Sequence, residues 1–157
     1  MLVKDIYIRD LTAITDDMTV REAIEILYTH RLPGVPLVDE DFRVIGYVSG
    51  SSISDVIIPD YVKRLVSTSY FPDIGILAKE LASIMDSPVS EVKKWTPVVE
   101  EEDTDLTALK LMLEHHRNVL PVVDEENRLR GVITKEAILS AIVHMIDNEK
   151  NQEEEEK

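Results

Sequence analysis

The apolar residues of the chain recur with helical spacing in two segments that lie far apart in the sequence. Spacings of three and four residues place one apolar stripe along a helix. The two stripes are Val20, Ala23, Ile24 and Leu27, and Leu106, Leu109, Met112 and Leu113. Thr19 and Glu22 match a capping box at the start of the first helix, and Asp103 or Thr104 can cap the second. We therefore expect an amphipathic helix in each segment.

Two short apolar runs follow each of these helices. Their length and their content of β-branched residues predict buried strands, each pair joined by an acidic turn. The runs are Val35–Val38 and Val44–Val48 in the first segment, and Leu120–Val123 and Leu129–Ile133 in the second. A hydroxyl residue, Ser49 or Thr134, follows the last strand of each set and marks the expected start of a further helix.

The same order of elements therefore occurs twice, at a shift of 85 residues. Laying residues 19–53 on residues 104–138 without a gap gives 10 identities, where chance would give about two. Upstream, Val3–Ile6 resembles Val89–Val92 at a shift of 86, so the first copy has one extra loop residue. Because a solenoid needs at least three stacked units, two copies favour a closed, pseudo-symmetric pair.

These patterns divide the chain into four parts. We expect a first unit at residues 1–56, a helical connecting segment at 57–88, a second unit at 89–147 and a disordered acidic tail at 148–157. The connecting segment is too long and too apolar for a plain linker. Its pattern indicates two helices, one beginning at Pro59 and one near Pro72 and Asp73.

Composition and charge exclude several classes of function. The net charge of −14 argues against general binding to nucleic acid or to a membrane surface. The absence of cysteine excludes thiolate metal sites and cysteine nucleophiles. Met1–Asp10 contains no long apolar run, so we expect no signal peptide or membrane span and a cytoplasmic location. His115 and His116 point to different sides of a helix, so no metal site is expected.

The duplicated strings lead to a family. Leu120-Pro121-Val122-Val123-Asp124 and Gly131-Val132-Ile133-Thr134 are echoed by Val35-Pro36-Leu37-Val38-Asp39 and Gly46-Tyr47-Val48-Ser49. With the preceding amphipathic helix in the same register, the chain resembles a stand-alone tandem CBS domain pair, also called a Bateman module. The resemblance covers most of residues 3–146.

The resemblance implies the fold, the ligand class and the assembly. The fold would be α+β, with two pseudo-symmetric β-α-β-β-α units packed sheet to sheet and a helical insertion between them. Clefts between the units would bind an adenosine-containing regulatory ligand, namely AMP, ADP, ATP or S-adenosylmethionine, and no other cofactor. The module would be a homodimer that regulates an unknown partner protein. It would not be an enzyme, and its carboxylates are indeed scattered rather than paired in one apolar cleft.

The family's site residues carry over to the strand-to-helix junctions. By resemblance, Ser49 and Thr134 hold the hydroxyl that contacts ribose or phosphate. The opposite wall of each cleft would come from the other copy, with Thr96, Pro97 and Val98 facing Ser49, and Thr12, Ala13 and Ile14 facing Thr134. A helix N-terminus at each hydroxyl would attract an anion.

The sequence departs from the family pattern three residues after each hydroxyl, where many nucleotide-binding copies have an aspartate. Ser52 and Ala137 occupy these positions. Because serine can still bond a sugar hydroxyl and alanine cannot, we rank the Ser49 cleft as the better nucleotide site. Arg31 and Arg117 are the candidate phosphate contacts, since arginine is long and has several donors.

Two alternatives stay open. The chain could be a dimeric scaffold with degenerate clefts and no nucleotide ligand, or an enzyme if residues 54–88 contribute unrecognised chemistry. Lys93-Lys94-Trp95 could be the cationic edge of a cleft, but we interpret it as a solvated turn with an anchoring tryptophan.

Overall fold

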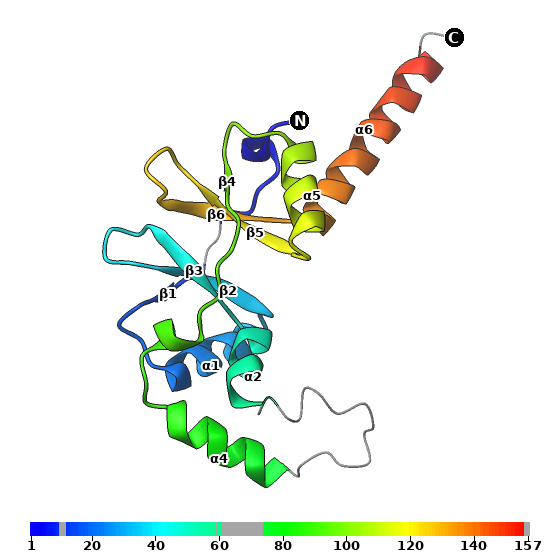
Figure 1. The fold of residues 1–157 in the computed structure, drawn as a ribbon. Coiled ribbons are helices and arrows are strands. Elements are labelled where there is room, and N and C mark those ends of the chain that lie inside the picture. Colours follow the sequence, from blue (N-terminus) through cyan, green and yellow to red (C-terminus); the bar gives the residue numbers. More distant parts are fainter. Residues whose placement is uncertain (10–11, 59, 61–73, 156–157) are drawn as a thin grey trace. The chain divides into compact units, whose positions relative to one another are not determined.

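Each copy of the sequence repeat folds around its own three-stranded sheet in a computed structural model of the chain (Figure 1). The structure describes residues 1–9, 12–58, 60 and 74–155. Contacts divide the chain into two units, one formed by residues 12–95 and one formed by residues 1–11 together with 96–157. We call them the Ser49 unit and the Thr134 unit after the hydroxyl residue that each contains.

The Ser49 unit has the order β-α-β-β-α. Its elements are β1 (Ile14–Thr15), α1 (Val20–Thr29), β2 (Gly34–Val38), β3 (Val44–Ser49) and α2 (Gly50–Ile57), followed by α4 (Ile74–Ile84) and a 3-10 helix at Val89–Val92. Strand β2 lies in the middle of the sheet, parallel to β1 and antiparallel to β3. Helix α1 begins where expected, because the Thr19 side chain accepts a bond from the Glu22 amide and the Glu22 carboxylate accepts one from the Thr19 amide.

The Thr134 unit repeats this arrangement. Its elements are a 3-10 helix at Val3–Asp5, then β4 (Val99–Glu100), α5 (Asp105–Glu114), β5 (Val119–Val123), β6 (Leu129–Thr134) and α6 (Lys135–Glu155). Thr104 caps α5, its side chain accepting a bond from the Thr107 amide. The central strand β5 is parallel to β4 and antiparallel to β6. The predicted α+β fold with two β-α-β-β-α copies is confirmed.

The boundaries of the units differ from those expected from the repeat, because the two copies exchange their leading segments. Residues 1–9, which begin the first copy, pack in the Thr134 unit, and residues 89–95, which begin the second copy, pack in the Ser49 unit. The Ile8 amide donates to the Val132 carbonyl at 2.8 Å, and the Val132 amide donates back at 3.0 Å. Tyr47 and Lys94 exchange the equivalent pair of bonds at 2.8 and 2.9 Å. Each segment thus satisfies the exposed backbone edge of β6 or β3.

The exchanged segments also complete the two cores. Val89 and Val92 join the apolar core of the Ser49 unit, and Val3 and Tyr7 join that of the Thr134 unit. All four side chains are at least nine-tenths buried. The remaining buried members are Ile14, Val20, Ala23, Leu27, Val35, Leu37, Val48 and Ile53 in the Ser49 unit, and Val99, Ala108, Met112, Leu120, Val122, Ile133 and Ile138 in the Thr134 unit.

The buried face of α5 agrees only in part with the predicted stripe, of which Met112 is buried and Leu109 packs against the core. Leu106 and Leu113 are 72% and 60% exposed, whereas Ala108 and Met112 are fully buried. Ala108 and Met112 are the equivalents of Ala23 and Leu27, which fill the same place against the sheet of the Ser49 unit. Leu106 and Leu113 were wrongly included in the stripe because the helix has more leucines than one face can bury.

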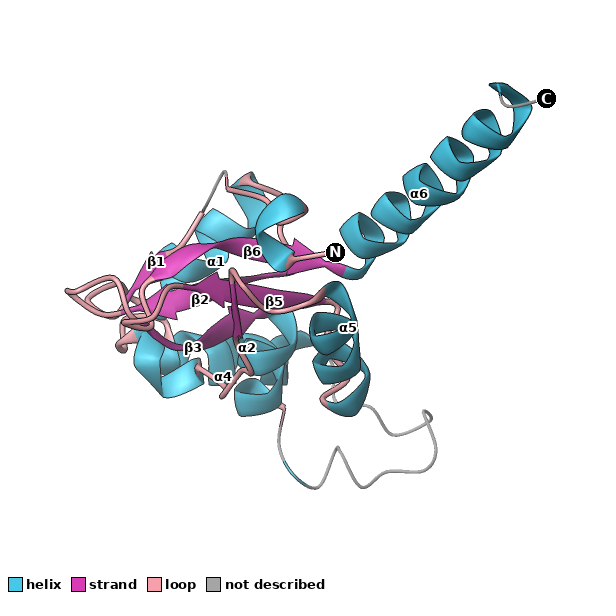
Figure 2. Cartoon of the chain, turned by 90° about the horizontal axis from the view of Figure 1, so that it is seen from above, coloured by secondary structure: helices cyan, strands magenta, loops and turns pink. Residues whose placement is uncertain are grey.

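The end of the chain also differs from expectation, since α6 continues through the predicted disordered tail to Glu155 (Figure 2). The residues after Ile146 contain no glycine or proline and are mostly of moderate to high helix propensity, so nothing in them stops the helix. The helix predicted to begin at Pro59 lies outside the described residues, and α4 is the described part of the connecting segment. None of the helices in the described part of the chain could span a membrane.

Helix α1 ends in a left-handed residue that is not glycine. Arg31 has a φ of 53°, and its equivalent His116 has a φ of 52° at the end of α5. The Leu32 amide donates to the Leu27 carbonyl at 2.9 Å and the Arg31 amide to the Tyr28 carbonyl at 3.2 Å. This pair of bonds is a Schellman motif, in which the left-handed position usually holds glycine.

Gly131 of β6 is required because another segment of the chain lies too close for a side chain, and not because its φ is positive. A Cβ at Gly131 would overlap the Tyr7 ring and the Ile8 carbonyl oxygen, both of the exchanged leading segment. A Cβ at the equivalent Gly46 would meet the Lys94 carbonyl oxygen at 3.1 Å and the Lys93 side chain at 3.2 Å, which leaves more room.

Gly131→Ala should therefore lower the free energy of unfolding by about 2 kcal/mol, as overpacking of a core does, and Gly46→Ala by less. Urea unfolding monitored by circular dichroism measures both. Gly50→Ala is the matched control, because no atom lies within 4 Å of the added Cβ. Equal stabilities of the Gly131 and Gly50 variants would contradict the close approach.

Arg31→Gly should raise the free energy of unfolding by about 0.5 to 1 kcal/mol, because glycine adopts the left-handed conformation without the Cβ penalty. Arg31→Ala keeps the Cβ and should stay close to the unsubstituted protein. The comparison is made by urea unfolding, and a loss of stability on glycine substitution would show that Arg31 is not held in this conformation.

Candidate functional site

The two predicted hydroxyl residues are the N-caps of the helices that follow the sheets. The Ser49 Oγ accepts a hydrogen bond from the Ser52 amide at 3.0 Å, and the Thr134 Oγ1 accepts one from the Ala137 amide at 3.1 Å. Both side chains are half-buried. Since each oxygen already accepts one bond from the protein, each hydroxyl still offers a ligand its proton and one lone pair.

The first-turn amides of both helices are mostly satisfied within the protein. Gly50 donates its amide proton to the Pro33 carbonyl and Lys135 donates its own to the Asn118 carbonyl, each at 3.2 Å. Within the described residues, this leaves the Ser51 amide in α2 and the Glu136 amide in α6 without an acceptor in the first turn. Each junction thus presents one hydroxyl proton and one amide proton at the positive end of a helix dipole.

Ser52 serves the helix cap. Its Oγ accepts from the Ser49 amide at 2.9 Å and donates to the Ser49 carbonyl at 3.0 Å. The side chain is only 2% exposed. A sugar hydroxyl would have to displace these bonds, so the difference that we expected between the Ser52 and Ala137 sites does not follow from the serine hydroxyl. Sequence reasoning missed this role, although Ser49 and Ser52 have the three-residue spacing of a capping box.

The residues expected to form the opposite walls belong to separate units. Thr12, Ala13 and Ile14 lie in the Ser49 unit, where Ile14 is a fully buried member of β1. Thr96, Pro97 and Val98 lie in the Thr134 unit, where the buried Thr96 hydroxyl donates to the Pro97 carbonyl at 3.0 Å. Their predicted pairing across the two copies stays a prediction.

The two candidate arginines occupy different positions in the repeat. Arg31 is exposed at the left-handed position that ends α1, and its equivalent in the second copy is His116. Arg117 is half-buried one position further on, and its amide donates to the Met112 carbonyl at 2.8 Å. Of the two candidates Arg31 is therefore the more exposed, and Lys135 adds a cation beside Thr134.

The tryptophan of Lys93-Lys94-Trp95 was expected to anchor the turn by being buried, and this expectation is wrong. The Trp95 side chain is 67% exposed. The turn is held instead by the backbone bonds between Lys94 and Tyr47. The Lys94 ammonium lies 3.7 Å from the Asp55 carboxylate of α2.

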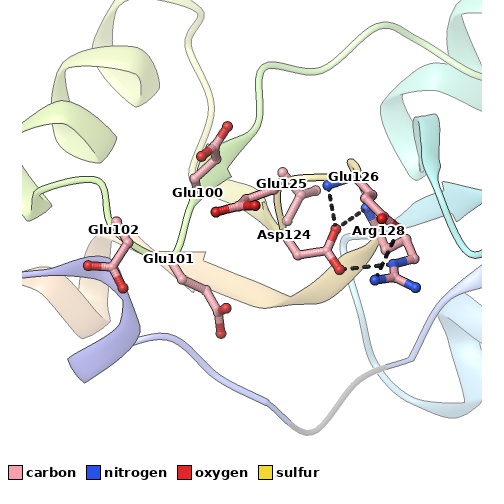
Figure 3. A pocket seen from close by; sticks show the side chains of 8 residues that line it. Glu100, Glu101, Glu102, Asp124, Glu125, Glu126 and Arg128 are labelled. Atoms are coloured by element: carbon pink, nitrogen blue, oxygen red, sulfur yellow. Dashed lines mark hydrogen bonds and ion pairs between the residues drawn. The ribbon is translucent and has the colours of Figure 1, made fainter.

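A hollow of about 330 Å³ in the Thr134 unit is strongly acidic (Figure 3). It lies at the β5–β6 hairpin, the opposite end of β6 from Thr134. Its lining residues are Glu100, Glu101, Glu102, Val123, Asp124, Glu125, Glu126 and Arg128. Bonds from the Arg128 and Glu126 amides and from the Arg128 guanidinium hold the pKa of Asp124 below its usual value. A hollow with this charge repels a nucleotide phosphate.

The described residues form no candidate metal centre. They contain no cluster of three or more His, Asp or Glu side chains that could hold a metal ion. The Tyr7 hydroxyl donates to the Glu101 carboxylate at 2.5 Å in a part-buried contact, and burial together with this bond raises the pKa of Tyr7. Tyr7 is a core residue that anchors the leading segment.

Comparison with known proteins matches both copies to one family. The model of the CBS domain matches residues 3–59 and 79–144. The chain is 32% identical over 146 residues to the chloroplastic CBS domain-containing protein CBSX1 of Arabidopsis thaliana. This alignment covers 87% of this chain but only 61% of the relative.

Solved structures show the same fold. The crystal structure of CBSX2 in complex with AMP aligns with a TM-score of 0.69 at 22% identity, covering 92% of this chain and 97% of that one. The CBS domain pair of protein MJ0100, in complex with 5′-methylthioadenosine and S-adenosyl-L-methionine, aligns with a TM-score of 0.63 at 23% identity, covering 92% and 98%. The match to both copies of the repeat and the shared fold show that this chain belongs to the CBS domain family and carries a tandem pair of CBS domains.

Proposed function

We propose that the chain is a non-catalytic regulatory module that binds an adenosine-containing small molecule at the N-terminal ends of α2 and α6. The observation that carries the proposal is the repeated junction itself. In both units a strand leads directly into a helix whose cap hydroxyl and one first-turn amide each keep a proton to donate. Such a junction suits a phosphate or carboxylate group.

The charge of the chain makes these junctions the favoured places for an anion. With a net charge of −14, the protein repels anions over most of its surface. At the junctions, the helix dipoles act together with local cations, which are Lys135 beside Thr134 and Arg31 in the Ser49 unit. The acidic hollow at the other end of β6 makes that end of the sheet unsuitable for an anion.

The adenosine moiety is inferred from the relatives. One solved neighbour is in complex with AMP, and another with 5′-methylthioadenosine and S-adenosyl-L-methionine. The group common to these ligands is adenosine, whereas their charged groups differ. We therefore propose AMP, ADP, ATP or S-adenosylmethionine as the ligand class, in clefts whose further contacts are the segments 12–14 and 96–98. The regulated partner would be a protein, and the location cytoplasmic.

A second candidate function is a dimeric scaffold without a nucleotide. It is favoured by exposed apolar side chains on the packed helices α5 and α6. Leu106, Leu113, Leu139, Ile142, Val143, Met145 and Ile146 are all more than a third exposed. Exposed apolar side chains on two helices in contact suit a protein interface. We propose that a second copy of the chain covers them, because an apolar face can pair with itself about a two-fold axis, whereas acidic surfaces of two copies repel.

The nucleotide site is tested by titrating AMP into the protein by calorimetry. Ser49→Asp keeps an N-cap but replaces the donated proton with a negative charge, so AMP affinity at this site should fall at least tenfold while the melting temperature is retained. Thr134→Asp tests the other site in the same way. Thr104→Ala is the matched control, because it removes the cap of α5 at no proposed site.

The control variant should lose some stability but no affinity. If no adenosine-containing ligand raises the melting temperature at millimolar concentration, the scaffold function replaces ligand sensing.

The proposed dimer is tested by light scattering. Leu113→Glu combined with Leu139→Glu should weaken dimerisation about thirty-fold or more, as loss of central apolar contacts does, without lowering the melting temperature of the monomer. Ile74→Glu is the matched control on α4, where the isoleucine is 79% exposed. A monomeric mass for the unsubstituted protein at all concentrations would exclude the dimer.

A further inference from the structure

The side chains of Tyr47 and Ser49 lie on the same face of the sheet in the Ser49 unit. Side chains along a strand alternate between its two faces, so positions 47 and 49 of β3 share one face. Val48, which lies between them, points to the other face, where it joins the buried core. The phenol of Tyr47 is therefore on the side of the sheet that presents the Ser49 hydroxyl.

The ring of Tyr47 extends along this face to the end of the strand. A Cβ added to Gly34 would overlap the ring and lie 2.8 Å from its hydroxyl oxygen. Gly34 is the strand partner of Ser49, and the Cβ positions of such partners lie about 4.5 to 5.5 Å apart on one face. The phenol hydroxyl thus takes the place of a side chain directly across from Ser49.

The same place is at the N-terminus of α2. The Gly50 amide of α2 donates to the Pro33 carbonyl at 3.2 Å, so the start of β2 lies against the first turn of this helix. The phenol hydroxyl, 2.8 Å from the Cβ position of Gly34, is within about 8 Å of the Ser49 Cβ. A phosphate group that accepts one bond of about 2.7 Å from each of two hydroxyls spans a similar distance.

Packing fixes the position of this hydroxyl. Tyr47 is only 8% exposed, and its ring covers Gly34. A side chain that is already ordered loses little entropy when a ligand binds to it. A phenol hydroxyl has a proton and acceptor lone pairs, so it can bond a ligand in addition to a protein partner.

The other unit has no such hydroxyl. The equivalents of Gly34 and Tyr47 are Val119 and Val132, and Val119 is the strand partner of Thr134. The two positions therefore differ together: where one unit has two valines, the other has a glycine and the tyrosine whose ring covers it. The exchange places a polar group beside one cap, where the other unit has only methyl groups.

We propose that Tyr47 is a ligand-binding residue of the Ser49 site and that its hydroxyl donates a hydrogen bond to the anionic group of the ligand. This inference rests on the proposed function, since it requires an anion at the N-terminus of α2. It adds a third donor to the Ser49 hydroxyl and the Ser51 amide. It also makes the two sites unequal, because the Thr134 site has two donors of this kind.

The first experiment removes only the hydroxyl. Calorimetric titration of AMP into Thr134→Asp protein reports the Ser49 site alone. Adding Tyr47→Phe keeps the ring over Gly34 and should lower AMP affinity about tenfold, the effect of losing one hydrogen bond to a charged group. Tyr28→Phe is the matched control in the same unit, because it removes an exposed phenol hydroxyl at no proposed site, and it should leave the affinity unchanged.

The second experiment transfers the hydroxyl to the other site. In Ser49→Asp protein, which reports the Thr134 site, Val119→Gly combined with Val132→Tyr should raise AMP affinity about fivefold over the same protein with Val119→Gly and Val132→Phe. The two transferred rings differ only in the hydroxyl, so their comparison removes effects of packing. Melting temperatures measured without ligand show that the variants are folded.

The outcomes separate this inference from the proposed function. Equal AMP affinity with tyrosine and phenylalanine at position 47 would overturn the role of the hydroxyl and leave nucleotide binding standing. A lower affinity for the Tyr28→Phe control as well would also overturn it, because the loss would then not be specific to Tyr47. If AMP fails to bind both the Thr134→Asp and the unsubstituted protein, the proposed function fails and this inference fails with it.

Discussion

The exchange of leading segments between the two copies is the constraint on which the rest of the structure depends. Each sheet has only three strands, and its outer strand, β3 or β6, would otherwise expose backbone groups that need partners. The bridges at Tyr47–Lys94 and Ile8–Val132 supply them. The same segments insert Val3, Tyr7, Val89 and Val92 into the cores. At about 1.5 to 3 kcal/mol for each large apolar side chain buried, these contacts are a substantial fraction of a small unit's stability. Neither unit is complete with its own copy of the repeat alone.

The strand-to-helix junctions combine a structural role with a binding role. Ser49 and Thr134 each terminate a strand and cap the following helix by accepting from the amide three residues later. A hydroxyl can do this and still donate its proton, whereas an aspartate cap offers only acceptors. The cap therefore orients the donor that a ligand would meet. Because of this dual use, folding depends on the accepting oxygen of the cap, whereas the proposed binding depends on its proton.

The two junctions are alike in backbone geometry but differ in their surroundings. Left-handed residues occur at equivalent positions, Arg31 with His116 and Phe42 with Asn127, so the repeat extends to the backbone conformation of its turns. The side chains at these and neighbouring positions have diverged. The Ser49 unit has Arg31 and the exposed Trp95, whereas the Thr134 unit has Lys135 and an arginine, Arg9, that packs on Tyr7. Local side chains, and not the second serine, distinguish the two candidate sites.

The sequence by itself determined the features that depend on local pattern. These are the duplicated β-α-β-β-α order, the four main strands to within a residue at each end, the capping box at Thr19 and the hydroxyl junctions at Ser49 and Thr134. Tertiary structure decided what depends on contacts between distant segments. The reciprocal exchange of residues 1–9 and 89–95 left no periodic signal, because each segment pairs with a strand of the other copy through its backbone. The buried face of α5 and the engagement of Ser52 were likewise set by neighbours, since leucine and serine suit both exposed and buried positions, and only packing determines which one they take.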